Sequence, residues 1–187
     1  FPYTTLFRSF GGAPLIARAL DAAETPALAA RVVVTRSPEV AELAYKAGVK
    51  TILHSLPGRN DTVRLGLEAL LSELPGLAGC IFLPGDQPLL RKESLEAMAR
   101  DFSALDEKER AILRLGFRAE DGTERLGSPV LFGSSYFDAL RSLPKGKGGG
   151  VVIRRHPESV RAVYAARKEE LEDADTVEEL ERLRKLL

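Results

Sequence analysis

Apolar and polar positions change period repeatedly along this chain, from short continuous apolar runs to stretches with helical spacing. The apolar and β-branched runs predict strands at 31–35, 49–53, 79–83, 111–115, 127–132 and 160–165. Stretches with helical spacing predict helices that begin near Pro14, Pro38, Asn60, Lys92, Ser134 and Thr176. Strands and helices therefore alternate almost from end to end.

Capping residues indicate where several of these helices begin and end. Ser37 and Pro38 are the residue types expected at an N-cap and at the first helical position, and Gly48 is placed to end that helix. Asn60 or Asp61 can cap the next helix. These local signals support the assignment made from periodicity.

Alternating strands and helices predict a three-layer α/β fold, with a mostly parallel sheet covered by helices on both faces. The Asp121-Gly122 pair is a hairpin signal and predicts one antiparallel excursion within 111–132. We expect residues 10–187 to form one domain. Residues 1–9 carry no clear turn or helix signal and are expected to be an atypical N-terminal segment.

Composition narrows the possible functions. The chain has 27 Lys and Arg residues and 27 Asp and Glu residues, so its formal net charge is zero. A zero balance provides no general attraction for nucleic acid or an anionic membrane surface. No apolar run approaches the roughly 18–20 residues that span a bilayer. Cys80 is the only cysteine, which excludes an internal disulfide. We therefore expect a cytoplasmic protein without nucleic-acid or membrane partners.

The segment Leu83–Pro88 is the first candidate for chemistry. Ligands of open α/β sheets bind beyond the carboxyl ends of the strands, and here an apolar strand leads directly to Asp86. Gly85 allows a ligand to approach the backbone. The alternative is that Asp86 caps the following turn.

A second acidic loop, Asp173-Ala-Asp175, precedes the last expected helix. Magnesium commonly takes one or two carboxylates and completes its shell with water and phosphate oxygens, so Asp86 and Asp175 could share one ion. The alternative is that these aspartates favour the positive end of the helix, which Thr176 and Glu179 already cap.

Two further loops could bind a nucleotide. Lys145–Gly150 combines glycines with Lys147 and could hold a phosphate, although a flexible surface loop is an equal alternative. In the strand-to-helix segment 58–62, Gly58, Asn60 and Thr62 could contact a base or sugar, with helix capping as the alternative.

Five motifs in order resemble the molybdenum-cofactor cytidylyltransferases, a branch of the Rossmann-like nucleotidyltransferases, over residues 11–187. The matching segments are 11–16, 58–67, 83–88, 127–131 and 173–176. The resemblance implies that Asp86 and Asp175 are the catalytic residues and bind Mg²⁺ or Mn²⁺. It also implies that 58–67 lies on the base side, and that the strand with Gly127 and Ser128 lies on the pterin side.

The activity implied by this resemblance is transfer of CMP from CTP to a molybdopterin-type phosphate acceptor, with release of pyrophosphate. A molybdoenzyme or its chaperone would be a protein partner. The alternatives are a related sugar- or isoprenoid-phosphate nucleotidyltransferase, a glycosyltransferase that uses Asp173 and Asp175 as its metal motif, and a nucleotide-binding remnant without activity.

Two departures from the family pattern affect these expectations. The family's N-terminal phosphate loop, roughly A-A-G-x-[GS]-x-R-[MF]-G-x-x-K, does not fit before Gly11. We therefore expect the chain as given to be nearly inactive, and its sheet to show a gap or a strand improvised from residues 3–8. In addition, segment 146–150 replaces the family's usual G-D-x-G-A-R loop. This replacement bears on which acceptor the protein uses.

Overall fold

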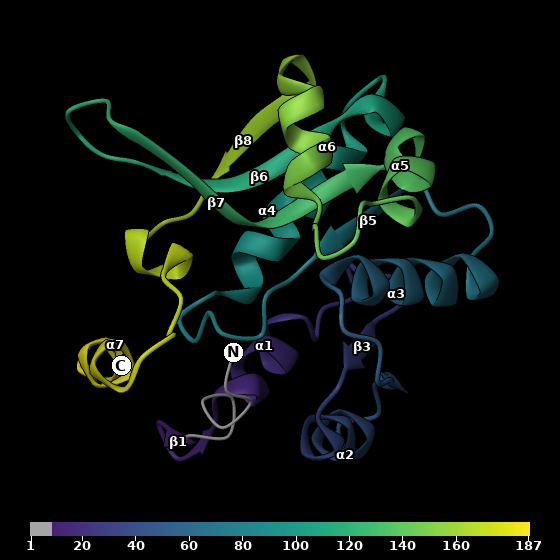
Figure 1. Cartoon of the computed structure of the whole chain (residues 1–187). Helices are drawn as coiled ribbons and strands as arrows, with labels where there is room; N and C mark the ends of the chain where they lie inside the picture. The colour runs from purple at the N-terminus through teal and green to yellow at the C-terminus, as the bar shows by residue number, and fades with distance from the viewer. Residues whose placement is uncertain (1–8) are drawn as a thin grey trace.

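A computed structural model describes residues 9–187 of the chain (Figure 1). The strands are β1 (Ser9–Phe10), β2 (Ala13–Pro14), β3 (Val32–Thr35), β4 (Lys50–Leu53), β5 (Gly79–Phe82), β6 (Ile112–Arg118), β7 (Glu124–Gly133) and β8 (Val160–Tyr164). The α-helices are α1 (Leu15–Ala22), α2 (Pro38–Lys46), α3 (Arg59–Glu73), α4 (Lys92–Ser103), α5 (Phe137–Arg141), α6 (Gly150–Arg155) and α7 (Val177–Arg184). Short 3₁₀ turns are η1 (Lys108–Arg110), η2 (Ser134–Tyr136), η3 (Pro157–Ser159) and η4 (Lys168–Leu171).

The predicted caps are observed, with one correction. Ser37 Oγ accepts a hydrogen bond from Val40 N at 3.3 Å, and Gly48 follows α2 with a φ of 70°. Helix α3 begins at Arg59 with Gly58 as its N-cap, earlier than a cap at Asn60 or Asp61 would place it. Asp61 caps this helix from its third position instead, because its carboxylate accepts from Gly58 N at 3.1 Å.

The fold is α/β, and its sheet is partly parallel. Four strands pair in the order β5-β7-β6-β8. Strand β6 is parallel to β8, whereas β7 lies between β5 and β6 and is antiparallel to both. Strands β3 and β4 form a separate parallel pair. The antiparallel excursion predicted from the Asp121-Gly122 turn is therefore the hairpin β6–β7.

Helices cover both faces of the four-stranded sheet (Figure 1). Alternate side chains of β6 and β7 belong to two buried clusters, as period-two strands require. Leu113, Leu115 and Leu131 pack in the cluster that contains Leu95, Met98 and Phe102 of α4. Ile112, Val130 and Phe132 pack in the cluster that contains residues of α3, α5 and α6. Within residues 9–187, no helix is long and apolar enough to cross a membrane.

The N-terminal hairpin β1–β2 packs on the C-terminal helix. Gly11 and Gly12 form its turn, with positive φ values of 59° and 84°. Both central residues of such a tight turn take positive φ, which glycine adopts without steric cost. Phe10 is fully buried in a cluster with Leu180 and Leu183 of α7. This packing fixes the position of α7 and of the acidic loop before it.

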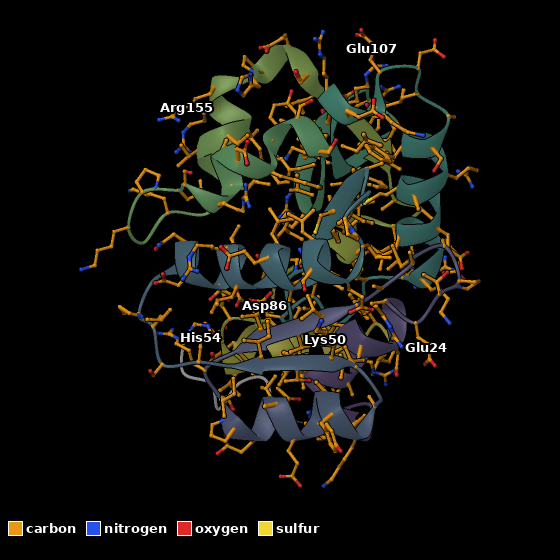
Figure 2. All side chains as sticks on the ribbon, turned by 90° about the vertical axis from the view of Figure 1, so that its right-hand side faces the viewer. Glu24, Lys50, His54, Asp86, Glu107 and Arg155 are labelled. Carbon is orange, nitrogen blue, oxygen red and sulfur yellow. The ribbon has the colours of Figure 1, made fainter. Side chains whose placement is uncertain are left out.

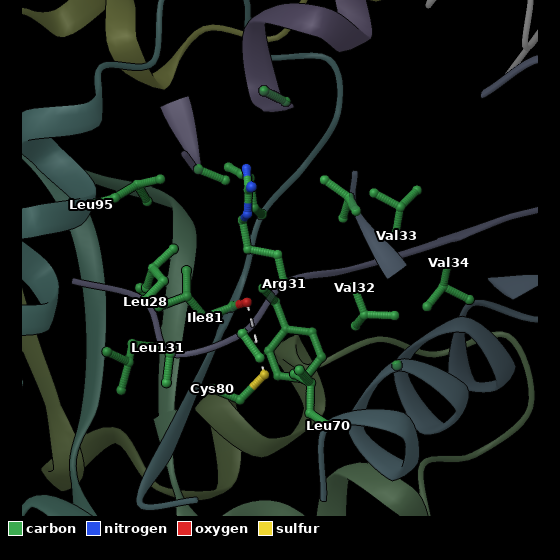
Figure 3. Close-up of a pocket in the computed structure, with 18 of the residues that line it drawn as sticks. Leu28, Arg31, Val32, Val33, Val34, Leu70, Cys80, Ile81, Leu95 and Leu131 are labelled. Atoms are coloured by element: carbon green, nitrogen blue, oxygen red, sulfur yellow. Dashed lines mark hydrogen bonds between the residues drawn. The ribbon is translucent and has the colours of Figure 1, made fainter. Parts of the chain in front are cut away.

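A gap separates the two parts of the sheet, between β3 and β5. In the described chain neither strand has a ladder partner on this side. A cavity of about 670 Å³ lies there. Figure 3 shows Val32, Val33 and Val34 on one side of the cavity, with Cys80 and Ile81 of β5 facing them across it. Within residues 9–187 the two strand systems are thus not joined, and because a strand from residues 3–8 would lie outside the described residues, the expectation of a gap or an improvised strand stays a prediction.

This gap leads to a prediction for hydrogen exchange. Amides of β6, which pairs with β7 and β8, will exchange slowly, whereas amides of β3 will exchange substantially faster because, among residues 9–187, β3 pairs only with β4. Hydrogen–deuterium exchange read on peptides covering 31–36 and 112–118 measures the difference. Equal protection of the two peptides would contradict it.

Candidate active site

The two acidic loops meet at one end of the fold. Asp86 follows β5, and Asp173 and Asp175 lie between η4 and α7. The backbone N–H of Ala174, between these two aspartates, donates to the backbone oxygen of Asp86 at 2.8 Å. This bond joins segments that are far apart in sequence and places all three aspartates in one neighbourhood.

Asp86 is in an electrostatically unfavourable place for a carboxylate. Burial, together with the nearby Asp173 and, more weakly, Asp175, raises the pKa of Asp86 to about 6, and Arg59 opposes this shift. Its Oδ1 atom is buried and has no hydrogen-bond partner in the described part of the chain, residues 9–187. Figure 2 shows Asp86 toward the middle of the molecule, whereas Glu107 and Arg155 lie at its outer edge. A positive ligand would relieve this arrangement.

Asp173 and Asp175 differ in their surroundings. Burial raises the pKa of Asp173, while a hydrogen bond from the Gln87 side chain and the charge of Arg125 oppose the shift. By surface area Asp173 and Asp175 are both exposed, and the Asp175 backbone N–H donates to Glu179 Oε2 at 3.0 Å. Thr176 Oγ1 accepts from Glu179 N at 3.1 Å, so the capping box of α7 does not use the Asp175 carboxylate.

The candidate nucleotide-binding loops also meet. Asn60 Oδ1 accepts from the backbone N–H of Gly146 at 2.8 Å, which ties the glycine-rich loop of Lys147 to the start of α3. Thr62 Oγ1 lies 3.3 Å from His54 Nε2. Arg59 in the same segment is close enough to Asp86 for its charge to oppose the raised pKa of that carboxyl.

Gly127 and Ser128 lie on β7, within the antiparallel part of the sheet. Arg114 of β6 donates to the backbone oxygen of Gly127 at 3.2 Å, which holds this stretch of β7 in place. Arg125, at the start of the same strand, affects the pKa of Asp173. Arg125 therefore links the strand that carries Gly127 and Ser128 to the acidic loop that carries Asp173.

The carboxylates of the two acidic loops suit a divalent cation that keeps part of its coordination shell for water and phosphate oxygens. Residues 9–187 contain no group of three His, Cys, Asp or Glu side chains that could hold a metal ion by themselves. Magnesium, however, often takes only one or two carboxylates and completes its octahedron with water and phosphate oxygens. The buried, unpartnered Oδ1 of Asp86 next to two further carboxylates fits such an ion.

Sequence comparison identifies the family. A sequence model described as the MobA-like NTP transferase domain matches residues 6–160. The chain belongs to this family. Comparison with curated proteins gives no match.

Solved structures with the same fold include proteins named as a nucleotidyl transferase, a synthase and a synthetase. A nucleotidyl transferase from Methanothermobacter thermautotroptrophicus is 19% identical, with a TM-score of 0.76 over 97% of this chain and 84% of that one. A 4-diphosphocytidyl-2C-methyl-D-erythritol synthase is 16% identical, with a TM-score of 0.72 over 97% and 92%. A CMP:2-keto-3-deoxy-manno-octonic acid synthetase in complex with CTP is 16% identical, with a TM-score of 0.71 over 97% and 90%.

The MobA-like match includes the strand-end loop of Asp86, the segment 58–62, the strand of Gly127 and Ser128, and Lys147. The acidic loop at 173–175 follows the matched region. Sequence patterns did not single out Gln87 or Arg125, both of which act on Asp173. Gln87 is only 3% exposed, and burial of a polar residue within the G-D-x-P motif becomes visible only in three dimensions.

Proposed function

We propose that this MobA-like NTP transferase transfers CMP from CTP to a molybdopterin-type phosphate acceptor and releases pyrophosphate. The observation that carries the proposal is the 2.8 Å bond from Ala174 N to the backbone oxygen of Asp86. It brings two acidic loops together, which supports a shared metal site for a bound triphosphate. A carboxylate centre with flanking cations suits phosphoryl chemistry, in which positioning and electrostatics dominate.

Asp86 and Asp175 are the proposed ligands of Mg²⁺ or Mn²⁺. When bound, such an ion neutralises charge on the phosphate oxygens. Asp86 supplies a buried oxygen without a partner, and Asp175 supplies an exposed carboxylate that the helix cap leaves available. Asp173, which accepts from Gln87, is the proposed support of this loop.

The remaining residues bind and orient the substrates in this proposal. Gly58, Asn60 and Thr62 hold the cytosine and ribose, Gly85 allows close approach, and Lys147 contacts the triphosphate. Gly127 and Ser128 face the acceptor. An acceptor phosphate oxygen forms a bond to the α-phosphorus of CTP while the bond to pyrophosphate breaks. A molybdoenzyme or its chaperone is the proposed recipient of the product.

Two of the similar structures favour a second candidate acceptor. The names of the erythritol synthase and of the octonic acid synthetase associate this fold with cytidine nucleotides, and with an isoprenoid precursor or a sugar acid. They support cytidine as the base and make a sugar or isoprenoid-precursor phosphate the alternative to a pterin.

A panel of nucleotides and acceptors, assayed on a version of the protein that carries the family's N-terminal phosphate loop, tests the proposal. Pyrophosphate release is measured with CTP, GTP, ATP and UTP, each with a molybdopterin-type phosphate, a sugar phosphate or an isoprenoid-precursor phosphate. We expect the highest kcat/KM with CTP and the pterin. Preference for another acceptor would support the alternative, and CTP binding without turnover would indicate an inactive nucleotide-binding protein.

A further inference from the structure

Glu170 is a buried acidic residue that the proposed mechanism does not use. Its side chain is 1% exposed, and within residues 9–187 it forms no ion pair. Burial of a carboxylate is costly unless specific hydrogen bonds compensate it. Glu170 lies in η4, shortly before Asp173. Glu170 is therefore expected to have specific hydrogen-bond partners near the acidic loop.

The partners of Glu170 lie just after the Asp86 loop. Its Oε2 atom accepts from the backbone N–H of Arg91 at 3.2 Å and from Ser94 Oγ at 2.5 Å. Arg91 is the N-cap of α4, but its side chain makes no capping hydrogen bond. Ser94 is the third residue of that helix, where a capping box would have its own glutamate. Glu170 supplies this missing carboxylate from a distant segment, and its charge suits the positive end of α4.

These bonds combine with another that joins the same segments. Ala174 N donates to the backbone oxygen of Asp86 at 2.8 Å, and the Gln87 side chain lies close enough to Asp173 to lower the pKa of its carboxyl. Hydrogen bonds thus tie the stretch 170–174 to the stretch 86–94 near both of its ends. Glu170 forms the tie at the α4 end, and the proposed metal site lies at the opposite end.

We propose that Glu170 is a positioning residue, which clamps the Asp173–Asp175 loop against the Asp86 loop through Arg91 N–H and Ser94 Oγ. This inference rests on the proposed function for its catalytic meaning. It assigns Glu170 no contact with substrate or metal. Partners that orient metal ligands typically contribute about 10- to 100-fold in metal affinity or activity, which sets the expected effect.

The test uses Glu170→Ala, Glu170→Gln and the matched control Glu181→Gln, an exposed glutamate of α7 paired with Arg184. Amide exchange of Ala174 in the metal-free protein reports the position of the loop, and titration with Mn²⁺ alone reports the site. We expect Glu170→Ala to speed Ala174 exchange at least about tenfold and to weaken Mn²⁺ binding about 10- to 100-fold. Glu170→Gln can still accept both hydrogen bonds and should stay close to wild type, as should Glu181→Gln.

Unchanged Ala174 exchange in Glu170→Ala would overturn the inference. If that variant does not fold, Ser94→Ala removes one partner of Glu170 and is measured in the same way, with faster Ala174 exchange expected and unchanged exchange counting against the clamp. Failure of the wild type to bind Mn²⁺ in a manner that depends on Asp86 would count against the proposed function. The rate of amide exchange at Ala174 in Glu170→Ala would still test the role of Glu170.

Discussion

Replacement of Asp86 by asparagine is expected to lower CMP transfer about a thousandfold, and also to raise the melting temperature of the metal-free protein. The loss of rate follows from removing a proposed ligand of a metal that stabilises transition-state charge by several kcal/mol. The gain in stability follows from the surroundings of Asp86, whose Oδ1 is buried without a partner and whose pKa is raised to about 6 by burial and neighbouring aspartates.

The sign of the stability effect depends on pH. The folded-state pKa of Asp86, about 6, lies above its ordinary value of 3.8, so the ionised group destabilises the fold. This loss of stability develops as the pH rises from about 4 to above 6. Because the side chain is partly exposed, we discount the effect to about 1–2 kcal/mol, or roughly 2–8 °C for a chain of this size. The gain from asparagine should therefore be present at pH 7.5 and absent near pH 4.

Thermal melting with a chelator and a pyrophosphate-release assay measure the two effects. Asp101→Asn, on the surface of α4, is a suitable control and should change neither. Adding Mg²⁺ should stabilise the wild type but not Asp86→Asn. A variant with near-normal turnover would show that Asp86 serves only its local turn.

Asp175→Asn should weaken Mn²⁺ binding about 100-fold, whereas Asp173→Asn should weaken it only about tenfold. The difference arises because the Gln87 side chain acts on Asp173 and lowers the pKa of its carboxyl, while the capping of α7 by Thr176 and Glu179 leaves the Asp175 carboxylate available. Both substitutions remove one negative charge, so the comparison separates direct coordination from the general field.

Titration of each variant with Mn²⁺, at a temperature where both remain folded, gives the two affinities. The capping box should keep α7 intact in both variants, and circular dichroism can verify this. A larger loss in Asp173→Asn would assign Asp173, rather than Asp175, as the second ligand.

Local signals in the sequence were sufficient for most elements but not for their arrangement. The Ser37 cap and the Asp121-Gly122 turn act between near neighbours, so the sequence predicts them well. Insertion of β7 between β5 and β6 depends on pairing between distant segments, for which periodicity gives no register. The start of α3 was misplaced because a glycine N-cap has no side chain to signal it.

The same distinction applies to the candidate site. Asp86 and Asp175 could be proposed because strand-end loops and acidic motifs are visible in one dimension. Glu170 and Arg125 could not, since their importance comes from partners far along the chain. A buried glutamate in a charged stretch such as Lys168–Leu171 looks like any solvated glutamate until its partners are known.

The gap between β3 and β5 divides the candidate site between two mechanical units. The segment 58–62, which we propose binds the base and ribose, follows β4, while the Asp86 loop follows β5. No ladder of backbone bonds joins the two strand systems within residues 9–187. A nucleotide held by both sides would act as a cross-link between them. Ligand at 100 times its Kd contributes about 2.7 kcal/mol to stability by mass action. In such a protein the substrate is also a structural component, and the fold is most rigid when its site is filled.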